Sequence, residues 1–210
     1  MNGLIRRASL AAFAAVAAVG ALAAPASAGI LTASASNCDD GAITQPFAAW
    51  GDQAHYKAVK GGSFETLAAG WTLSGKAKVV AGNEPWKVGG AGHSNSLVLP
   101  AGSNAISPVA CVGLGEPTLR FFAKKNRAAL LGISTLAVSV YVKTSLGLTV
   151  PVPIGVVLGN GQWKPTAPML IVANLLPLLP GDKTPVAFQF TPILGDWQID
   201  DVYVDPMRMR

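Results

Sequence analysis

The sequence has 210 residues, half of them hydrophobic, and a formal net charge of +5. So small a charge argues against nucleic-acid binding, because nucleic-acid-binding proteins concentrate basic residues on one face. The basic residues that cluster are interpreted as a solvated loop, Lys124, Lys125 and Arg127, and as a chain terminus, Arg208 and Arg210.

Residues 1–28 are predicted to be a cleaved signal peptide. Arg6 and Arg7 precede an uncharged apolar run over 8–24, and Ala26-Ser27-Ala28 supplies small residues at a cleavage site. This order is typical of a secretory signal rather than a membrane anchor, so we expect a secreted protein with no transmembrane segment after cleavage. The arginine pair also raises the twin-arginine route, but the residues around it favour the general secretory route.

Cleavage after residue 28 would leave 182 residues with a charge of +3, enough for one domain with a substantial core. Residues 29–36 are small and polar and are interpreted as a flexible lead-in. We therefore expect a single domain over 37–210.

The two cysteines, Cys38 and Cys111, both lie in the exported portion. An even count in an oxidising compartment predicts one disulfide bond. Closing a loop whose ends are 73 positions apart would stabilise the fold by at most about 4 kcal/mol. A metal site with His55 and His93 is the rival, but the lack of closely spaced cysteines favours the disulfide.

After the signal the chain consists of short runs broken by glycine, proline, asparagine and aspartate, with no amphipathic helix. This pattern predicts an all-β protein, a two-sheet antiparallel β-sandwich of about nine or ten strands. In chain order, the clearest strands are predicted at 54–59, 76–81, 96–99, 119–124, 136–143, 148–154, 186–191 and 197–204.

Three of these segments alternate between apolar and polar residues, which is typical of a sheet packed on one side. The residues predicted to face the core are Leu119, Phe121 and Ala123, then Leu136, Val138, Val140 and Val142, then Val186, Phe188 and Phe190.

The segment 163–180 is harder to interpret, because the apolar run 169–172 is followed by leucines interrupted by Pro177 and Pro180. The prolines forbid a continuous helix. One interpretation is a strand entering the core followed by a packed loop. The other is an exposed apolar patch over 169–179 that binds a protein partner.

Three motifs occur in a fixed order along the chain. Gly61-Gly62-Ser63-Phe64-Glu65 is followed by Gly70-Trp71, then by His93-Ser94-Asn95-Ser96-Leu97-Val98-Leu99, and finally by Ile199-Asp200-Asp201-Val202. Together they resemble the jelly-roll carbohydrate-binding modules of the galactose-binding-like group, over about 60–204. The resemblance implies that 61–71 is the first strand and closure of the sandwich, with Trp71 and Trp197 structural. Residues 37–59 precede the matched stretch and are interpreted as an extension packed on the sandwich.

In the families resembled, the first and last strands meet around a structural calcium ion. The matching carboxylates are Glu65 and Asp201, with Asp200 as a second choice. Alternation along 199–204 independently predicts a β-bulge at Asp200-Asp201, because one extra residue is needed to return Val202 and Val204 to the core. The alternative is that these acids are solvated at a sheet edge.

Sugar binding requires exposed aromatic rings flanked by polar groups. Tyr141 lies on the polar face of its strand, where Gln189, Arg120 and Phe122 would join it if neighbouring strands share that face. Trp86 and Trp163 are alternative platforms. For each of these residues the alternative is a role in the core or in anchoring a loop.

No catalytic motif is complete. Gly92-His93-Ser94-Asn95-Ser96 lacks the last glycine of a nucleophile elbow, and neighbouring acids such as Asp200 and Asp201 tend to point to opposite faces. The sequence therefore predicts a secreted, non-catalytic protein that binds a glycan or cell-envelope polymer. The first alternative is a structural or adhesive protein that binds a protein partner through 169–179, and the second is a hydrolase with an unrecognised site.

Overall fold

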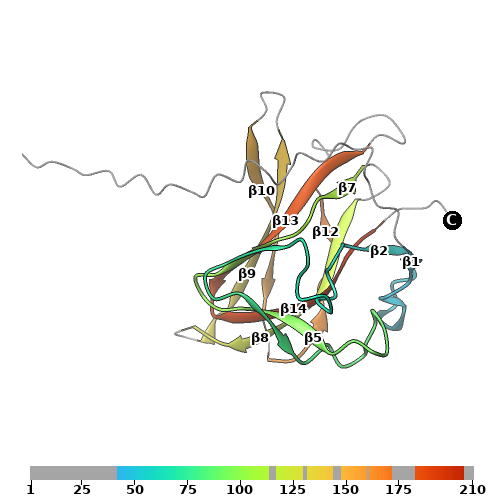
Figure 1. The fold of residues 1–210 in the computed structure, drawn as a ribbon. Coiled ribbons are helices and arrows are strands. Elements are labelled where there is room, and N and C mark those ends of the chain that lie inside the picture. The colour runs from blue at the N-terminus through green and yellow to red at the C-terminus, as the bar shows by residue number, and fades with distance from the viewer. Residues whose placement is uncertain are drawn as a thin grey trace, which may run out of the picture.

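The computed structural model describes residues 42–113, 117–129, 132–143, 148–159, 161–171 and 183–205. They form a two-sheet antiparallel β-sandwich of jelly-roll type, which confirms the predicted fold class (Figure 1). The elements are β1 (Ile43–Thr44), the 3-10 helix η2 (Ala48–Trp50), β2 (Tyr56–Ala58), β3 (Thr72–Ser74), β4 (Lys78–Ala81), β5 (Asn95–Leu99), β6 (Asn104–Ile106), β7 (Ala110–Val112), β8 (Thr118–Arg127), β9 (Thr135–Lys143), β10 (Thr149–Leu158), β11 (Lys164–Pro165), β12 (Met169–Leu170), β13 (Thr184–Leu194) and β14 (Asp196–Val204).

Several predictions concern residues outside the described ranges. The signal peptide 1–28, the lead-in 29–36, Cys38, most of the segment 169–179, Arg208 and Arg210 all lie there. The Cys38–Cys111 disulfide and the export of the chain therefore stay predictions. Within the described ranges, no helix combines the length and the apolar character that a membrane crossing requires.

Sheet A is built around β14, both of whose edges are paired. β8 pairs with one edge over most of its length, while β5 and β2 pair with successive parts of the other edge. β4 extends the sheet beyond β5, β1 extends it beyond β2, and the short strands β11 and β12 extend it beyond β8.

Sheet B has the strand order β10-β9-β13-β6-β3, and β7 also pairs with β13. Its long strands β9, β10 and β13 run side by side (Figure 1). The structure has more strands than predicted because β1, β3, β6, β7 and β11 contain only two or three residues each, too few to show an alternating pattern.

The core lies between the two sheets. The residues predicted to face it from β8, β9 and β13 are all buried, with at most 5% of their surface exposed. Aromatic rings join the sheets at the centre, where Phe190 of β13 meets Phe121 of β8 edge to face at 5.1 Å between centroids. Trp71 and Trp197 are buried in the same cluster, as predicted.

The stretch 61–71 is not a strand, so this part of the prediction is wrong. It forms consecutive turns, in which Phe64 takes a left-handed backbone conformation with φ 58° that extended pairing does not allow. It does close the sandwich, since Phe64 packs edge to face on Trp71 at 5.0 Å and Val202 donates its N–H to the carbonyl of Gly62 at 3.1 Å. The two end motifs are therefore spatial partners, as predicted.

The segment that joins β1 to β2 covers the outer face of sheet A, while β1 and β2 join the sheet itself, which confirms that the described part of the extension packs on the sandwich. Phe47 stacks on Phe122 at 5.4 Å between centroids and meets Tyr56 and Tyr203 edge to face at 4.9 and 5.7 Å. All four rings are at most 5% exposed. β14 is consequently buried on both faces.

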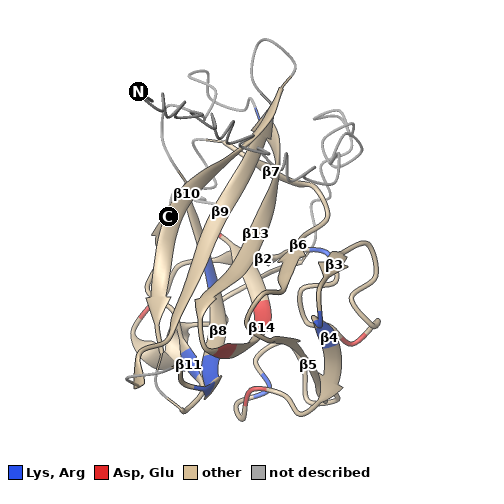
Figure 2. Cartoon of the chain, turned by 90° about the vertical axis from the view of Figure 1, so that its left-hand side faces the viewer, with Lys and Arg blue, Asp and Glu red and all other residues tan. Residues whose placement is uncertain are grey.

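The basic residues Lys124, Lys125 and Arg127 are not in a loop, as was expected, but at the end of β8 (blue in Figure 2). Arg127 is solvated, with 77% of its side chain exposed, and pairs with Asp196 of β14 at 2.9 Å. The three basic residues therefore mark the end of β8 and do not form the concentrated basic face of a nucleic-acid-binding protein.

Candidate functional site

The two neighbouring acids of β14 lie at a β-bulge, as predicted. The pairing of β14 with β8 shifts between Asp200 and Tyr203, where β14 holds one extra residue. Asp201 accommodates the bulge with a left-handed φ of 47°. Val202 and Val204 consequently return to the core, each 1% exposed.

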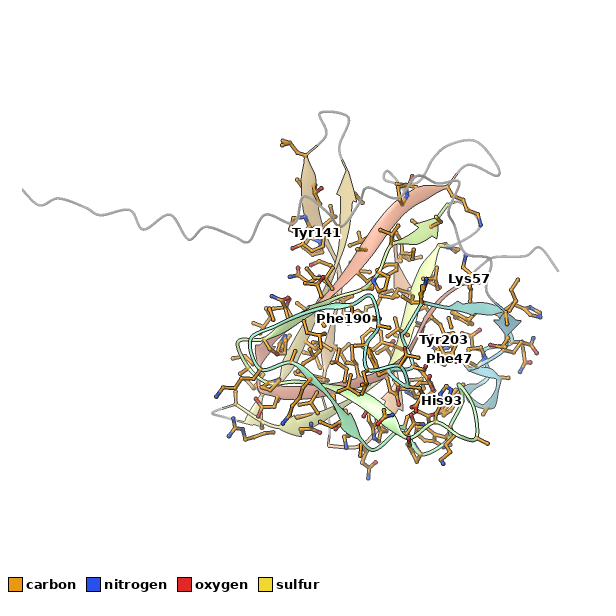
Figure 3. The ribbon with its side chains drawn as sticks, viewed as in Figure 1. Phe47, Lys57, His93, Tyr141, Phe190 and Tyr203 are labelled. Carbon is orange, nitrogen blue, oxygen red and sulfur yellow. The ribbon has the colours of Figure 1, made fainter. Side chains whose placement is uncertain are left out.

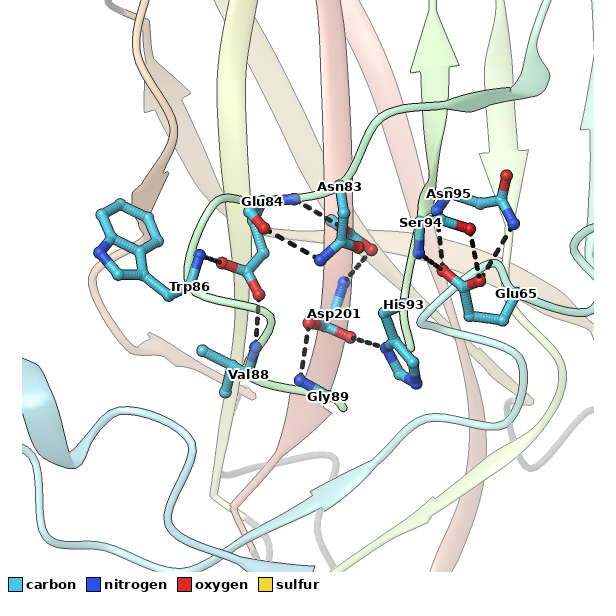
Figure 4. Close-up of polar contacts among 11 residues, drawn as sticks. Glu65, Asn83, Glu84, Trp86, Val88, Gly89, His93, Ser94, Asn95 and Asp201 are labelled. Atoms are coloured by element: carbon cyan, nitrogen blue, oxygen red, sulfur yellow. Dashed lines mark hydrogen bonds and ion pairs between the residues drawn. The ribbon is translucent and has the colours of Figure 1, made fainter. Parts of the chain in front are cut away.

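Both acids accept hydrogen bonds from the loop that joins β4 to β5, and Figure 4 shows the contacts of Asp201. The carboxylate of Asp200 accepts the backbone N–H of Glu84 at 3.0 Å, and that of Asp201 accepts the N–H of Gly89 at 3.0 Å. His93, on the same loop, brings Nδ1 to 3.7 Å from Asp201. The bulge thus fastens this loop to the centre of sheet A.

Glu84 is a residue that the sequence reasoning missed. It is fully buried, and its carboxylate accepts the N–H groups of Trp86, at 2.6 Å, and of Val88. A carboxylate that accepts N–H groups two and four residues ahead closes a tight turn. The turn-forming residues Asn83 and Pro85 beside Glu84 were the available signal, and the consequence is a fixed position for Trp86.

Burial dominates the electrostatics of the bulge. It raises the pKa of Asp200 to about 9, with the charge of Asp201 adding to the effect, and raises the pKa of Asp201 to about 6. The pKa of Tyr203 also rises, through burial and then through the neighbouring carboxylates. Asp200 and Asp201 are 0% and 2% exposed, so the alternative of solvated acids at a sheet edge is wrong.

Glu65 does not contact the bulge and instead binds the start of β5. Its carboxylate accepts the N–H groups of Ser94 and Asn95, both at 2.8 Å, the Asn95 side-chain amide at 3.0 Å and the Ser94 hydroxyl at 3.4 Å. These four donors occupy the lone pairs that a calcium ion would need, so Glu65 does not fit as a ligand here. Across the ranges that the structure describes, no three His, Cys, Asp or Glu side chains form a group suited to a metal ion. Calcium binding by Asp200 and Asp201 stays a prediction.

Three tryptophans come together at the outer side of sheet A, and we call Trp50, Trp86 and Trp163 the aromatic surface. Trp50 and Trp86 meet edge to face with their centroids 4.8 Å apart, and both contact Phe122, at 5.3 and 5.7 Å. Trp163 packs against the same cluster, with the ammonium group of Lys124 5.1 Å from its ring centroid. Trp86 is 47% exposed, whereas Trp50 and Trp163 are half-buried.

The polar face expected around Tyr141 is divided between the two sheets. Tyr141 of β9 and Gln189 of β13 lie on the outer side of sheet B, whereas Arg120 lies on β8 of sheet A and is 8% exposed. The expected grouping of Arg120 with Tyr141 is wrong, because β8 pairs with β14 and not with β9. Figure 3 shows Tyr141 well away from Phe47, which packs beside Arg120. Ligand binding by Tyr141 and Gln189 stays a prediction.

Solved structures similar to this chain include carbohydrate-binding modules. One is the family 22 module with the catalytic module of Clostridium thermocellum endo-1,4-beta-D-xylanase 10B, complexed with xylohexaose, at 19% identity and a TM-score of 0.48, covering 70% of this chain and 28% of that one. Another is the tandem of family 22 modules from Paenibacillus barcinonensis Xyn10C, at 14% identity and a TM-score of 0.46, covering 82% and 46%. A third is TmCBM61 in complex with beta-1,4-galactotriose, at 19% identity and a TM-score of 0.40, covering 71% and 97%.

This chain therefore spans less than half the length of the first two of these structures. No protein-family model matches the sequence, and no curated protein matches it.

The described part of the apolar segment 169–179 has a mixed character. Met169 and Ile171 are buried, and Leu170 is 69% exposed. Leu170 lies at a cavity of about 580 Å³ between β10 and the strands β11 and β12, where Val156 and Leu158 are also exposed. Residues 172–179 lie outside the described ranges, so the choice between a core strand and an exposed patch stays open for them.

Proposed function

We propose that this protein is a secreted, non-catalytic glycan-binding protein, and that it binds through the aromatic surface of Trp50, Trp86 and Trp163. The observation that carries the proposal is Trp86, a tryptophan 47% exposed on a loop that buried carboxylates fasten to sheet A. Trp86 lies outside the motifs that carry the family resemblance. The proposal therefore does not depend on similarity to another protein.

The chemistry of the aromatic surface suits a saccharide. A sugar ring presents C–H groups on its face and hydroxyl groups at its rim, and an indole ring offers a large flat apolar area with a polar N–H at its edge. Trp50 and Trp86 lie at 89° to each other and so present two differently oriented flat surfaces. A saccharide chain that bends between successive rings would contact both of them.

The aromatic surface is also held rigidly, which favours binding. The N–H groups of Glu84, Trp86, Val88 and Gly89 all donate to buried carboxylates, so the loop carrying Trp86 needs little further ordering. A site that is ordered before binding loses less conformational entropy when its ligand arrives. The buried acids therefore support binding indirectly, through the position of Trp86.

The same contacts support a non-catalytic role. Glycoside hydrolysis requires two carboxyl groups that face the substrate from opposite sides of the scissile bond. Glu84, Asp200 and Asp201 are at most 2% exposed, and each accepts backbone N–H groups. They are placed to hold the fold, and not to reach a ligand on the aromatic surface.

A second function, binding a protein partner through 169–179, is supported by the exposed Leu170 beside the cavity at β10. A partner that buries this site would be displaced by Leu170→Asp, whereas glycan binding would be unaffected. We favour glycan binding because the aromatic surface joins three tryptophans in one packed cluster, and Leu170 is the one exposed residue of the described part of that segment.

The test is a panel of neutral and acidic polysaccharides, measured by pull-down and by quenching of tryptophan fluorescence, with and without a chelator. We expect at least one glycan to bind and to quench the emission, because tryptophans form the contact surface. Failure of every glycan on the panel to bind, in calcium and in chelator, would overturn the proposed function and leave the fold unaffected.

A further inference from the structure

We infer that a cleft beside Trp50 is a subsite for one uncharged sugar unit of the glycan, a proposal that rests on the proposed function. The cleft has a volume of about 450 Å³ and lies on the outer side of sheet A. Trp50 belongs both to the aromatic surface and to the cleft wall, so one ligand can occupy both. Its lining includes Trp50, Asp52, Tyr56, Thr118 and Arg120, of which Tyr56 is 1% exposed and holds Asp52 in place instead of reaching a ligand.

The polar groups of the cleft are fixed before any ligand arrives. The carboxylate of Asp52 accepts the hydroxyl of Tyr56 at 2.7 Å and the guanidinium Nη1 of Arg120 at 2.5 Å. Arg120 is further held by its Nε, which donates to the carbonyl of Thr166 at 2.6 Å, and by the ring of Phe47 at 4.3 Å. Such a fixed pairing of an acceptor with a donor suits the vicinal hydroxyl groups of a sugar, each of which donates and accepts.

Tyr56 stays protonated and Asp52 stays ionised at neutral pH. Burial, followed by the hydrogen bond to Asp52, raises the pKa of Tyr56 to about 12, so the phenol stays a donor. Burial acts to raise the pKa of Asp52, but the hydrogen bonds from Tyr56 and Ala54 and the charge of Arg120 hold it below its ordinary value. Asp52 is therefore ionised, and its side chain is 23% exposed, which leaves it within reach of a ligand.

Thr118 supplies a separate observation that points to a ligand. It lies on the same outward face of β8 as Arg120, is 8% exposed, and its Oγ1 is buried with no hydrogen-bond partner. Buried hydroxyl groups are almost always hydrogen-bonded, and one left unpaired destabilises the fold. A sugar hydroxyl seated at this end of the cleft would provide the missing partner.

The charges of the cleft define the class of sugar. Asp52 is the more exposed member of its ion pair with Arg120, 23% against 9% for the two side chains, so a ligand meets the carboxylate before the guanidinium. A uronic acid would bring a further negative charge into this surface, and like charges at close range disfavour binding. The lining therefore favours a neutral hexose or pentose unit over a uronate.

The cleft is formed jointly by sheet A and by the extension, and the extension lies outside the stretch that resembles carbohydrate-binding modules. Trp50, Asp52 and Tyr56 all belong to the extension that precedes the matched stretch, and sheet A contributes Thr118 and Arg120 from β8. The subsite exists only because the extension packs on the outer face of sheet A. Its ligand preference thus follows from this chain's own contacts.

The experiment titrates xylohexaose, cellohexaose and hexagalacturonate into the wild type, Thr118→Val, Thr191→Val and Trp86→Ala, by calorimetry. Thr118→Val removes an unpartnered hydroxyl without changing the shape of the side chain, so a structural role would leave stability unchanged or raised. Thr191→Val is the matched control on the outer side of sheet B.

We expect Thr118→Val to bind the neutral hexasaccharide about threefold to tenfold more weakly, as the loss of one hydrogen bond predicts, with an unchanged or raised melting temperature. Thr191→Val should bind as the wild type does, and hexagalacturonate should bind more weakly than the neutral probes. Unchanged affinity in Thr118→Val together with weakened binding in Trp86→Ala would overturn the subsite and leave the proposed function standing. Preferred binding of hexagalacturonate would overturn the assignment to a neutral sugar, and no binding of any probe by the wild type would overturn both proposals.

Discussion

The two outer faces of the sandwich have similar strands beneath them and different surroundings. On sheet B, Tyr141 and Gln189 of the alternating strands stay half-buried at the outer side, as alternation predicts. On sheet A, the outward residue Phe122 of β8 is fully buried, because Phe47 and the rest of the extension cover it. Alternation along a strand identifies which side meets the shared core, but it does not reveal what covers the other side.

The largest effect should come from removing the ring that joins the extension to sheet A. Phe47→Ala would leave a cavity among Tyr56, Phe122 and Tyr203, and should lower the free energy of unfolding by about 3–4 kcal/mol. Urea denaturation measures this loss, with Phe190→Ala between the sheets as the comparison. A loss below about 1 kcal/mol would mean that the cover is not an integral part of the fold, and the difference between the two faces would disappear.

A smaller effect should come from the buried charge beneath the Trp86 loop. Burial raises the pKa of Asp201 from 3.8 to about 6, so the folded state holds a proton that the unfolded state releases. Stability from this group is therefore complete below about pH 4 and is lost as the pH rises through about 6. Asp201→Asn removes the charge, and asparagine tolerates the φ of 47° at this position.

We expect Asp201→Asn to be about 1–3 kcal/mol more stable than the wild type at pH 8, and to gain nothing at pH 4. Chemical denaturation at the two pH values measures the difference. A variant less stable than the wild type at pH 8, and more so when calcium is present, would show instead that a cation uses this carboxylate.

The smallest effect concerns Glu65, which joins the turn region 61–71 to β5. Glu65→Gln keeps one acceptor oxygen for Ser94 and Asn95 and should lower the free energy of unfolding by about 1 kcal/mol. The loss should be equal in calcium and in chelator, because nitrogen and oxygen donors take up the carboxylate. A melting temperature that depends on calcium in the wild type and not in Glu65→Gln would restore the role implied by the family resemblance.

The fold could be predicted further from the sequence than the site could. Residues that alternate strictly, such as those of β9, have one environment on each face, and the bulge at Asp200-Asp201 follows from the need to return Val202 to the core. The turns at 61–71 could not be foreseen, because Phe64, Leu67 and Ala68 take left-handed conformations that these residue types rarely adopt.

The candidate site depends on contacts between distant parts of the chain. Trp86 and Trp163 were identified as exposed aromatic candidates, but nothing in their spacing predicts that Trp50 joins them around Phe122. Arg120 has the sequence pattern of a solvated strand residue, and its pairing with Asp52 requires the extension to fold back across sheet A. Glu84 is polar and beside a proline, which is typical of a surface turn, yet it is fully buried.

The measurement that separates the two outer faces most directly is the affinity of Trp86→Ala and Tyr141→Ala for the glycan that the wild type binds most tightly. Each variant removes one accessible aromatic ring, from sheet A's side and from sheet B's side respectively. We predict that Trp86→Ala weakens binding about tenfold or more, as expected for an aromatic residue at the centre of a binding surface, and that Tyr141→Ala binds as the wild type does. Weakened binding in Tyr141→Ala with unchanged binding in Trp86→Ala would contradict the account and place the glycan on sheet B.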